Sequence, residues 1–482
     1  MAALVFVGAM TAGCSGDDLT AQTPQLPDTT NGTVTMKINV SLSEHASTRE
    51  LNPNFTKNFA TGDKIAVIYK NTNNETVKVE SDPLQATDIL SNNSAKFSVT
   101  LTNPQASTPV RYIYPASMAA DDVSATTPDN DATIKWTKLA SQNNMLTNIS
   151  SDLDLAVFDG TLSAQGILPA AELKNQLTIG NFTINNGTDN ITENVKELII
   201  YDGTNTYNIR NFYSSSILVI MKPITTTQTV TIKAITADNK FIKSVTNKEL
   251  AKNTKYDINV SMTARYPLAV TDASVSSDDI GSVIGADGNI YLNAAAAAAA
   301  SPATTAVAMI TYVCSENAES SPYNHGLALA LSDANDGYFY WKTEQSDAGH
   351  IWQTDRNNFT SESGLQYNSF TPGHNTDTYP AFKAAMANNG TTKPTNCSDW
   401  FLPTAYQWNQ MIDACKNVLG TKNSYEDLRD GFNGVGGTNM VGEYWSSTED
   451  GTNTAWSYRF NLGYWASQPK TFYCIVRSAL AF

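Results

Sequence analysis

Residues 33–42 read Thr33-Val34-Thr35-Met36-Lys37-Ile38-Asn39-Val40-Ser41-Leu42. The five apolar side chains of this stretch alternate with polar ones without a break. Successive side chains of a β-strand point to opposite faces of the sheet, so a period of two predicts a strand with one face in a core. We therefore expect residues 33–42 to form a half-buried strand.

The residues before this strand have the composition of an export signal followed by a tether. Residues 1–14 form an apolar run that ends in Thr11-Ala12-Gly13-Cys14. This end resembles a lipobox, the motif whose cysteine receives the lipid of a bacterial lipoprotein. The run is shorter than the ~20 apolar residues of a transmembrane helix and fits a secretory signal. Residues 15–32 are polar and contain proline, which favours a flexible tether. The alternative is a buried strand in which Cys14 is an ordinary cysteine.

Short strand patterns continue to residue 264 and fall into two series. The first includes Lys64–Tyr69, Lys96–Leu101 and Val110–Tyr114, and the second runs from Leu177–Ile184 to Tyr256–Met262. Clusters of Asn, Asp, Gly and Pro separate the strands. This spacing favours antiparallel sandwiches over βαβ units. We predict a mainly β protein with two tandem β-sandwich domains, over residues 33–165 and 166–264.

The last third of the chain differs in kind, because it holds seven of the eight Trp residues. Thr404 and Gln407 have the spacing of a capping box, and an apolar helical face follows from Trp408 to Cys415. Residues Phe472–Phe482 have the pattern of a final strand. We expect a linker over residues 265–285 and an α+β domain over residues 286–482.

Composition and motifs limit the possible functions. The net charge is −15, and an acidic surface repels phosphate backbones, so nucleic acid is not expected as a partner. The sequence has no H-E-x-x-H, no G-x-S-x-G and no P-loop lysine. Its four histidines have no metal-ligand spacing. We therefore expect no enzyme activity, no metal and no cofactor.

Aromatic residues in turn-rich stretches are the candidate ligand-binding groups. Aromatic rings stack on sugar faces and anchor protein partners when they are exposed, and otherwise form a core. The candidates are Trp341, Trp352, Trp445, Trp456 and Trp465. The same region holds Cys314, Cys397, Cys415 and Cys474. These four cysteines permit three complete pairings, and buried thiols are the alternative to disulfides.

Residues 1–264 resemble the Bacteroidales-type fimbrillin family. The resemblance rests on Cys14 with its tether, the alternating strand, Arg49, Gly62-Asp63-Lys64-Ile65, Tyr112-Ile113-Tyr114-Pro115 and Lys255-Tyr256-Asp257-Ile258. It implies transthyretin-like sandwiches and a precursor that travels as a lipoprotein. It further implies that a protease cuts after Arg49 and removes the first strand. The vacated groove then accepts a strand from a neighbouring subunit. The displaced side chains would be those of Val34, Met36, Ile38, Val40 and Leu42.

The remaining residues resemble the C-terminal domain of Legionella collagen-like adhesins, which is similar to C-type-lectin-like folds. The resemblance rests on Trp400–Thr404, Tyr444–Glu449 and Val476–Phe482. Phe401 stands where that module usually has arginine, and the lectin calcium motifs E-P-N and W-N-D are absent from the sequence.

Together the two resemblances imply a subunit of a fimbrium, most simply its tip adhesin. The C-terminal domain would bind a host or microbial glycan or protein. The other partners would be fimbrial subunits, and a lipid anchor would hold the precursor at the outer face of the outer membrane. The alternative is a monomeric glycan-binding lipoprotein of the cell surface that never polymerises.

Overall fold

The computed structural model confirms a mainly β protein, which folds as two compact units. It describes residues 32–42, 58–91, 93–144, 155–211, 214–314, 323, 325–346, 376–416 and 424–482. The first unit is the N-terminal sandwich. The second unit contains the second sandwich and the C-terminal module.

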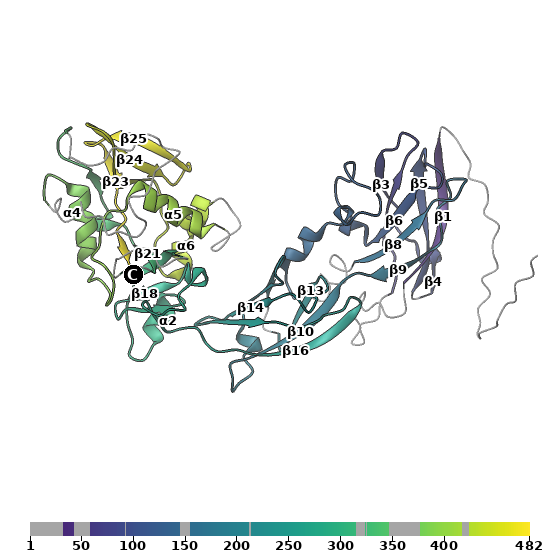
Figure 1. Ribbon diagram of the computed structural model, residues 1–482, viewed down its shortest axis with the longest axis horizontal. Helices are drawn as coiled ribbons and strands as arrows, with labels where there is room; N and C mark the ends of the chain where they lie inside the picture. The colour runs from purple at the N-terminus through teal and green to yellow at the C-terminus, as the bar shows by residue number, and fades with distance from the viewer. Residues whose placement is uncertain are drawn as a thin grey trace, which may run out of the picture. The chain divides into compact units, whose positions relative to one another are not determined.

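The first sandwich is built from strands in the order β3-β2-β6-β8-β9-β1-β5-β4 (Figure 1). These are β1 (Thr33–Leu42), β2 (Ala66–Lys70), β3 (Thr76–Glu80), β4 (Ile89–Ser91), β5 (Ser94–Thr102), β6 (Pro109–Tyr114), β8 (Ala156–Thr161) and β9 (Ala171–Asn175). Apolar side chains of β1 and β5 share one core with those of β2 and β6. The half-buried strand expected at residues 33–42 is therefore present with its predicted bounds.

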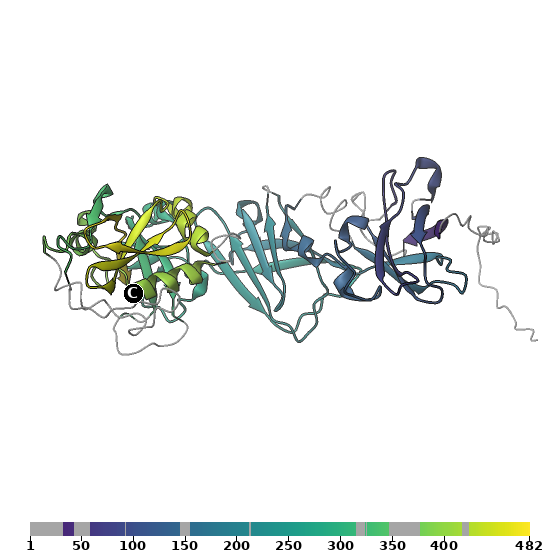
Figure 2. The ribbon, with the colours of Figure 1, turned by 90° about the horizontal axis from the view of Figure 1, so that it is seen from above.

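The second sandwich consists of a three-stranded sheet, β13-β10-β16, and a five-stranded sheet, β15-β14-β11-β12-β7. Its strands are β7 (Ser141–Gln142), β10 (Thr178–Asn185), β11 (Glu197–Tyr201), β12 (Thr206–Arg210), β13 (Ile217–Met221), β14 (Val230–Ile235), β15 (Lys240–Val245) and β16 (Thr254–Ser261). Figure 2 shows its antiparallel strands side by side, in teal.

The boundary between the sandwiches differs from the predicted position at residue 165. Strand β9 follows that position, yet it pairs with β8 and β1 of the first sandwich. Strand β7 precedes it, yet it pairs with β12 of the second. The buried side-chain amide of Gln142 holds β7 in the second sandwich. Its Nε2 donates to the Ile220 carbonyl at 2.7 Å, and its Oε1 accepts from the Ile220 N–H at 2.9 Å. Such long-range pairings leave no periodic trace in the sequence.

The C-terminal module combines a six-stranded sheet, β17-β19-β18-β20-β21-β27, with a five-stranded sheet, β22-β26-β23-β24-β25. Its strands are β17 (Leu268–Ala269), β18 (Val283–Gly285), β19 (Asn289–Tyr291), β20 (Ala306–Val313), β21 (Gly326–Ala330), β22 (Tyr338–Tyr340), β23 (Glu443–Gly451), β24 (Thr454–Arg459), β25 (Tyr464–Pro469), β26 (Tyr473–Ile475) and β27 (Ala479–Ala481). Its helices are α2 (Ala294–Ala299), α4 (Pro380–Ala387), α5 (Ala405–Cys415) and α6 (Ser424–Val435). The capping box at Thr404 and Gln407 is present, and the module is α+β as expected. Its likeness to C-type lectins stays a prediction.

The predicted final strand is instead two strands in different sheets. Strand β26 pairs with β22 in one sheet, and β27 pairs with β21 in the other. Arg477 lies between them with a fully buried side chain, and its Nε is 2.7 Å from Asp333 Oδ1. A buried charge needs a partner, and the chain turns where this pair forms.

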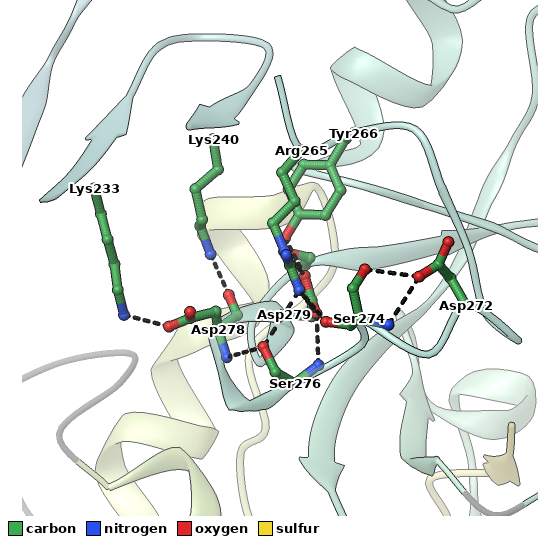
Figure 3. Close-up of polar contacts among 10 residues, drawn as sticks. Lys233, Lys240, Arg265, Tyr266, Asp272, Ser274, Ser276, Asp278 and Asp279 are labelled. Atoms are coloured by element: carbon green, nitrogen blue, oxygen red, sulfur yellow. Dashed lines mark hydrogen bonds and ion pairs between the residues drawn. The ribbon is translucent and has the colours of Figure 1, made fainter. Parts of the chain in front are cut away.

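Residues 265–285 are not a linker, because they fold as part of the C-terminal module. Strands β17 and β18 belong to its six-stranded sheet, and a 3-10 helix, η7 (Ser277–Asp279), lies between them. Figure 3 shows two lysines of the second sandwich reaching this helix. Lys233 forms an ion pair with Asp278, and Lys240 Nζ donates to the Asp278 carbonyl at 2.5 Å. Burial lowers the pKa of Lys240 to about 8.

Asp279 is the centre of this junction (Figure 3). Its carboxylate is fully buried and accepts from Arg265 Nε at 2.6 Å and from Tyr266 Oη at 2.9 Å. It also accepts from the Ser276 N–H at 2.9 Å, which completes a capping box on η7. Loss of this carboxylate would leave a guanidinium and two other donors without their acceptor.

We predict that Asp279→Ala destabilises the second unit by about 3–5 kcal/mol, as expected when one partner of a buried ion pair is removed. Thermal and guanidinium unfolding followed by circular dichroism measure the change. Asp272→Ala is the matched control, since Asp272 is exposed and accepts only from its neighbour Ser274 among the bonds of Figure 3. Equal stability of the two variants would contradict the role of Asp279.

Candidate functional site

Strand β1 presents five apolar side chains to the core of the first sandwich. None of them is more than 8% exposed, and Val40 is completely buried. The side chains between them, Thr35, Lys37 and Asn39, are exposed. The predicted displaced strand therefore has a buried face and a solvent face, so its register is strongly specified.

The pairing of β1 is unequal on its two sides. It pairs antiparallel with β5 over nine positions, from Thr33↔Thr102 to Ser41↔Ser94. Its pairing with β9 is parallel and covers only Val40, Ser41 and Leu42. One long ladder and a short parallel one hold β1 in place, while β9 is also joined to β8.

Removal of β1 would expose both the backbone of β5 and the core beneath it. The N–H and C=O groups of β5 that now face β1 would become an open sheet edge, which is a template for another strand. At ~1.5–3 kcal/mol for each buried side chain, refilling the five apolar positions would contribute on the order of 10 kcal/mol before entropic costs. The site is chemically suited to accept a strand of the same alternating pattern.

The predicted lipidation and processing residues, Cys14 and Arg49, lie outside the described residues. Both therefore stay predictions. Residues 43–57, which contain Arg49, join β1 to the remainder of the sandwich in the sequence. A single cut there separates β1 from the chain that follows it.

The four candidate tryptophans that the structure describes are buried and do not form a binding surface. Trp341 and Trp445 are completely buried, and Trp456 and Trp465 are 5% and 7% exposed. This corrects the expectation that they are available to a ligand. Trp352 lies outside the described residues.

The polar atoms of these indoles explain why they fit a core. Trp341 Nε1 donates to the Ser446 carbonyl and Trp445 Nε1 to the Phe339 carbonyl, both at 2.8 Å. Trp465 Nε1 donates to Asn409 Oδ1 at 2.9 Å. A buried indole needs such an acceptor, and strands β22 and β23 and helix α5 supply it.

The buried cysteines of the module are thiols and not disulfides. Cys397, Cys415 and Cys474 are at most 1% exposed. Burial raises the pKa of the Cys397 thiol to about 12, and it also raises the pKa values of the other two. Such thiols are unreactive packing groups.

The exposed aromatic residues of the module are tyrosines and a phenylalanine that the sequence analysis did not select. Tyr338 is 62% exposed, Tyr473 53% and Phe472 43%. The sequence feature that could have identified the tyrosines is the alternation in Tyr338-Phe339-Tyr340. In a short strand this alternation places the two tyrosines on the same face.

An apolar hollow of about 500 Å³ opens in the second sandwich between β15 and β16. Both are edge strands of their sheets. Lys243 lines the hollow, and it pairs with the buried Ile232, so it lies on the inner face of β15. A charge on the inner face of an edge strand disfavours pairing with a further strand. This hollow is therefore a weaker strand acceptor than the position of β1.

Within the described residues, no helix has the length and apolar composition that crossing a bilayer requires. No protein-family model and no curated protein matches the chain.

Several solved structures are similar to the chain. A fimbrial protein from Bacteroides ovatus shares 13% identity with a TM-score of 0.30, and the match covers 94% of this chain and 100% of that one. A fimbrial assembly protein from Parabacteroides distasonis shares 11% identity with a TM-score of 0.29, over 48% and 93% of the two chains. A tip fimbrial protein from Porphyromonas gingivalis shares 8% identity with a TM-score of 0.25, over 48% and 95%.

All three are fimbrial proteins by their descriptions. Similarity at this level does not assign a function to this chain.

We predict that Trp445→Ala destabilises the C-terminal module by about 3–5 kcal/mol, because a buried indole leaves a cavity and an unpaired carbonyl. Denaturant unfolding followed by far-UV circular dichroism measures this. Leu462→Ala is the control, since Leu462 is 56% exposed. A Trp445→Ala protein with normal stability would show that the indole is not part of the core.

Proposed function

We propose that this chain is a fimbrial subunit that assembles by strand exchange. The observation that carries the proposal is the position of β1, whose five buried side chains close a core and whose exposed face is polar. A strand from another subunit with the same alternation would restore both the β5 ladder and the core. The sequence resemblance to fimbrillins supports the same conclusion.

Export would precede assembly. The precursor would carry a lipid on Cys14 and would reach the outer face of the outer membrane as a lipoprotein. Cleavage after Arg49 would then release residues 14–49, which include the lipidated Cys14 and β1, from the folded subunit. Exposed loop residues are preferred sites of proteolysis, and the polar stretch around Arg49 has a composition that suits them.

The subunit would occupy the tip of the fibre. A shaft subunit must donate a strand as well as accept one. The last described strand, β27, is completely buried and hydrogen-bonded to β21. Phe482 N–H also donates to the Gly326 carbonyl at 3.1 Å. Donating β27 would open the six-stranded sheet, so we expect it to remain within its own module. The C-terminal module would then bind a glycan or a protein on a host or microbial surface.

Processing at Arg49 is the first test. We predict that Arg49→Ala retains β1 and stays out of fimbriae, whereas the mature wild-type chain begins at Glu50. N-terminal sequencing of protein from intact cell surfaces, together with the size of heat-labile polymers, measures both effects. Lys57→Ala is the matched control, because Lys57 is the other lysine or arginine of residues 43–57. Polymers whose subunits still contain residues 33–42 would contradict strand exchange. Wild-type protein found only outside polymers would favour the monomeric glycan-binding lipoprotein.

Position in the fibre is the second test. We predict that immunogold labelling with antibodies against residues 376–482 marks only the ends of fimbriae, because β27 is held in its own sheet. Antibodies against the major subunit of the same fimbriae serve as the control and should mark the whole shaft. Label from this chain along the shaft would contradict the tip position and leave strand exchange intact.

A further inference from the structure

Exposed aromatic rings gather on two paired strands of the C-terminal module. Strands β22 and β26 are antiparallel, with Tyr340 opposite Tyr473 and Tyr338 opposite Ile475. Residues directly opposite one another share a face of the sheet, as do alternate residues of one strand. Tyr338, Tyr340 and Tyr473 therefore lie on one face. We call these three residues the tyrosine platform.

Two of the three rings of the platform, those of Tyr340 and Tyr473, lie against one another. The centroids of Tyr340 and Tyr473 are 4.2 Å apart, and their planes are tilted by 32°. Tyr338 and Tyr473 are more than half exposed, at 62% and 53%. Phe472, the residue before Tyr473, is 43% exposed.

A rigid core supports the platform from behind. Phe339 and Cys474, the residues between the tyrosines, point to the opposite face and pack in a core with Trp341 and Trp445. The Phe339 carbonyl accepts from Trp445 Nε1 at 2.8 Å, and Trp341 N–H donates to the Lys470 carbonyl at 2.9 Å. The buried tryptophans thus fix the backbone that presents the tyrosines, so little ordering is needed when a ligand binds.

An amide and a hydroxyl lie where the chain leaves β22 and where it enters β26. Gln345 Nε2 donates to Thr471 Oγ1 at 3.1 Å where the chain continues from the two strands, and both side chains reach solvent. Hydrogen bonding to Tyr473, together with desolvation, raises the pKa of Tyr340. The platform therefore offers ring faces and hydroxyls, and Gln345 offers an amide.

We propose that the tyrosine platform binds a neutral saccharide. A pyranose has a C–H face that stacks on an aromatic ring and a rim of uncharged hydroxyls that hydrogen-bond to tyrosine, threonine and glutamine. An anionic glycan would need cations at the contact, and a protein partner would need a larger apolar patch than these few rings provide. The platform is open, so single contacts would be weak, and many subunits on one cell would strengthen binding by multivalency. The proposal rests on the adhesive role of the C-terminal module.

The test uses the full mature chain and immobilised neutral glycans: mannan, β-1,4-galactan and poly-N-acetyllactosamine. Heparin and polygalacturonate represent anionic glycans. We expect the wild-type chain to bind at least one neutral glycan. The double variant Tyr338→Ser/Tyr473→Ser should bind the same glycan about tenfold more weakly, since two stacking contacts are lost. Both side chains are mostly exposed, so unchanged thermal unfolding should accompany the loss.

Tyr464→Ser is the matched control, because Tyr464 is a 42% exposed tyrosine of the same module outside the platform. It should bind as the wild type does. Binding of only the anionic glycans, binding of none of the five, or equal binding by the double variant and the wild type would each overturn the proposal.

A separate assay keeps the proposed function distinguishable. Adhesion of fimbriated cells to a host or microbial surface is measured for both chains. Adhesion that the double variant retains, and that protease treatment of the surface abolishes, would overturn the platform and leave the adhesive role standing. Loss of adhesion in the double variant that periodate oxidation of surface glycans reproduces would support the platform.

Discussion

The apolar face of β1 is the constraint on which the first sandwich depends. A sandwich core must be closed along its whole length, and β1 closes it between β5 and β9 with side chains that water hardly reaches. The long antiparallel pairing with β5 satisfies hydrogen-bonding groups of the β1 backbone. The short parallel pairing with β9 joins β1 and β5 to the other strands of the sheet. The chemistry of β1 specifies a pattern and not a particular segment, because any strand with the same alternation satisfies the same requirements. This is the physical reason why the strand can be both essential and replaceable.

The C-terminal module is closed in a different way, by buried charges as well as by apolar contacts. Lys470 and Glu449 form an ion pair in which both side chains are completely buried, and Lys470 Nζ also donates to the Thr452 carbonyl at 2.8 Å. Arg477 pairs with Asp333 and donates to the carbonyls of Ala330 and Thr438. Buried pairs of this kind contribute little net stability, but breaking one is costly, so they favour a single arrangement of the chain.

These two kinds of closure suit different tasks. The β1 position relies on alternation and backbone pairing, which an incoming strand can reproduce. The last strands of the module are held by specific charges and by packing around Trp445, which no generic strand can replace. The contacts around Asp279 make residues 265–285 part of the folded module. The neighbouring Asp278 bonds to Lys233 and Lys240 of the second sandwich. A module built in this way can present a fixed surface, such as the tyrosine platform, and the proposed strand exchange would take place at a separate strand, β1.

The sequence by itself determined the features that depend on local periodicity. The alternation of residues 33–42 predicted β1 with its observed bounds, and the spacing of Thr404 and Gln407 predicted the start of α5. The mainly β composition also followed from local patterns. Tertiary structure alone decided the rest, because it depends on partners that are distant in the chain. Strand β9 joins the first sandwich through β1, which precedes it by more than one hundred residues, as the pairing of Val40 with Ala171 illustrates. Trp341, Trp445 and Trp465 can be buried in the core because backbone carbonyls, and for Trp465 the side-chain amide of Asn409, accept their N–H groups. The exposed surface is formed instead by Tyr338 and Tyr473, since alternation along β22 and β26 turns them away from the core that holds Phe339 and Cys474.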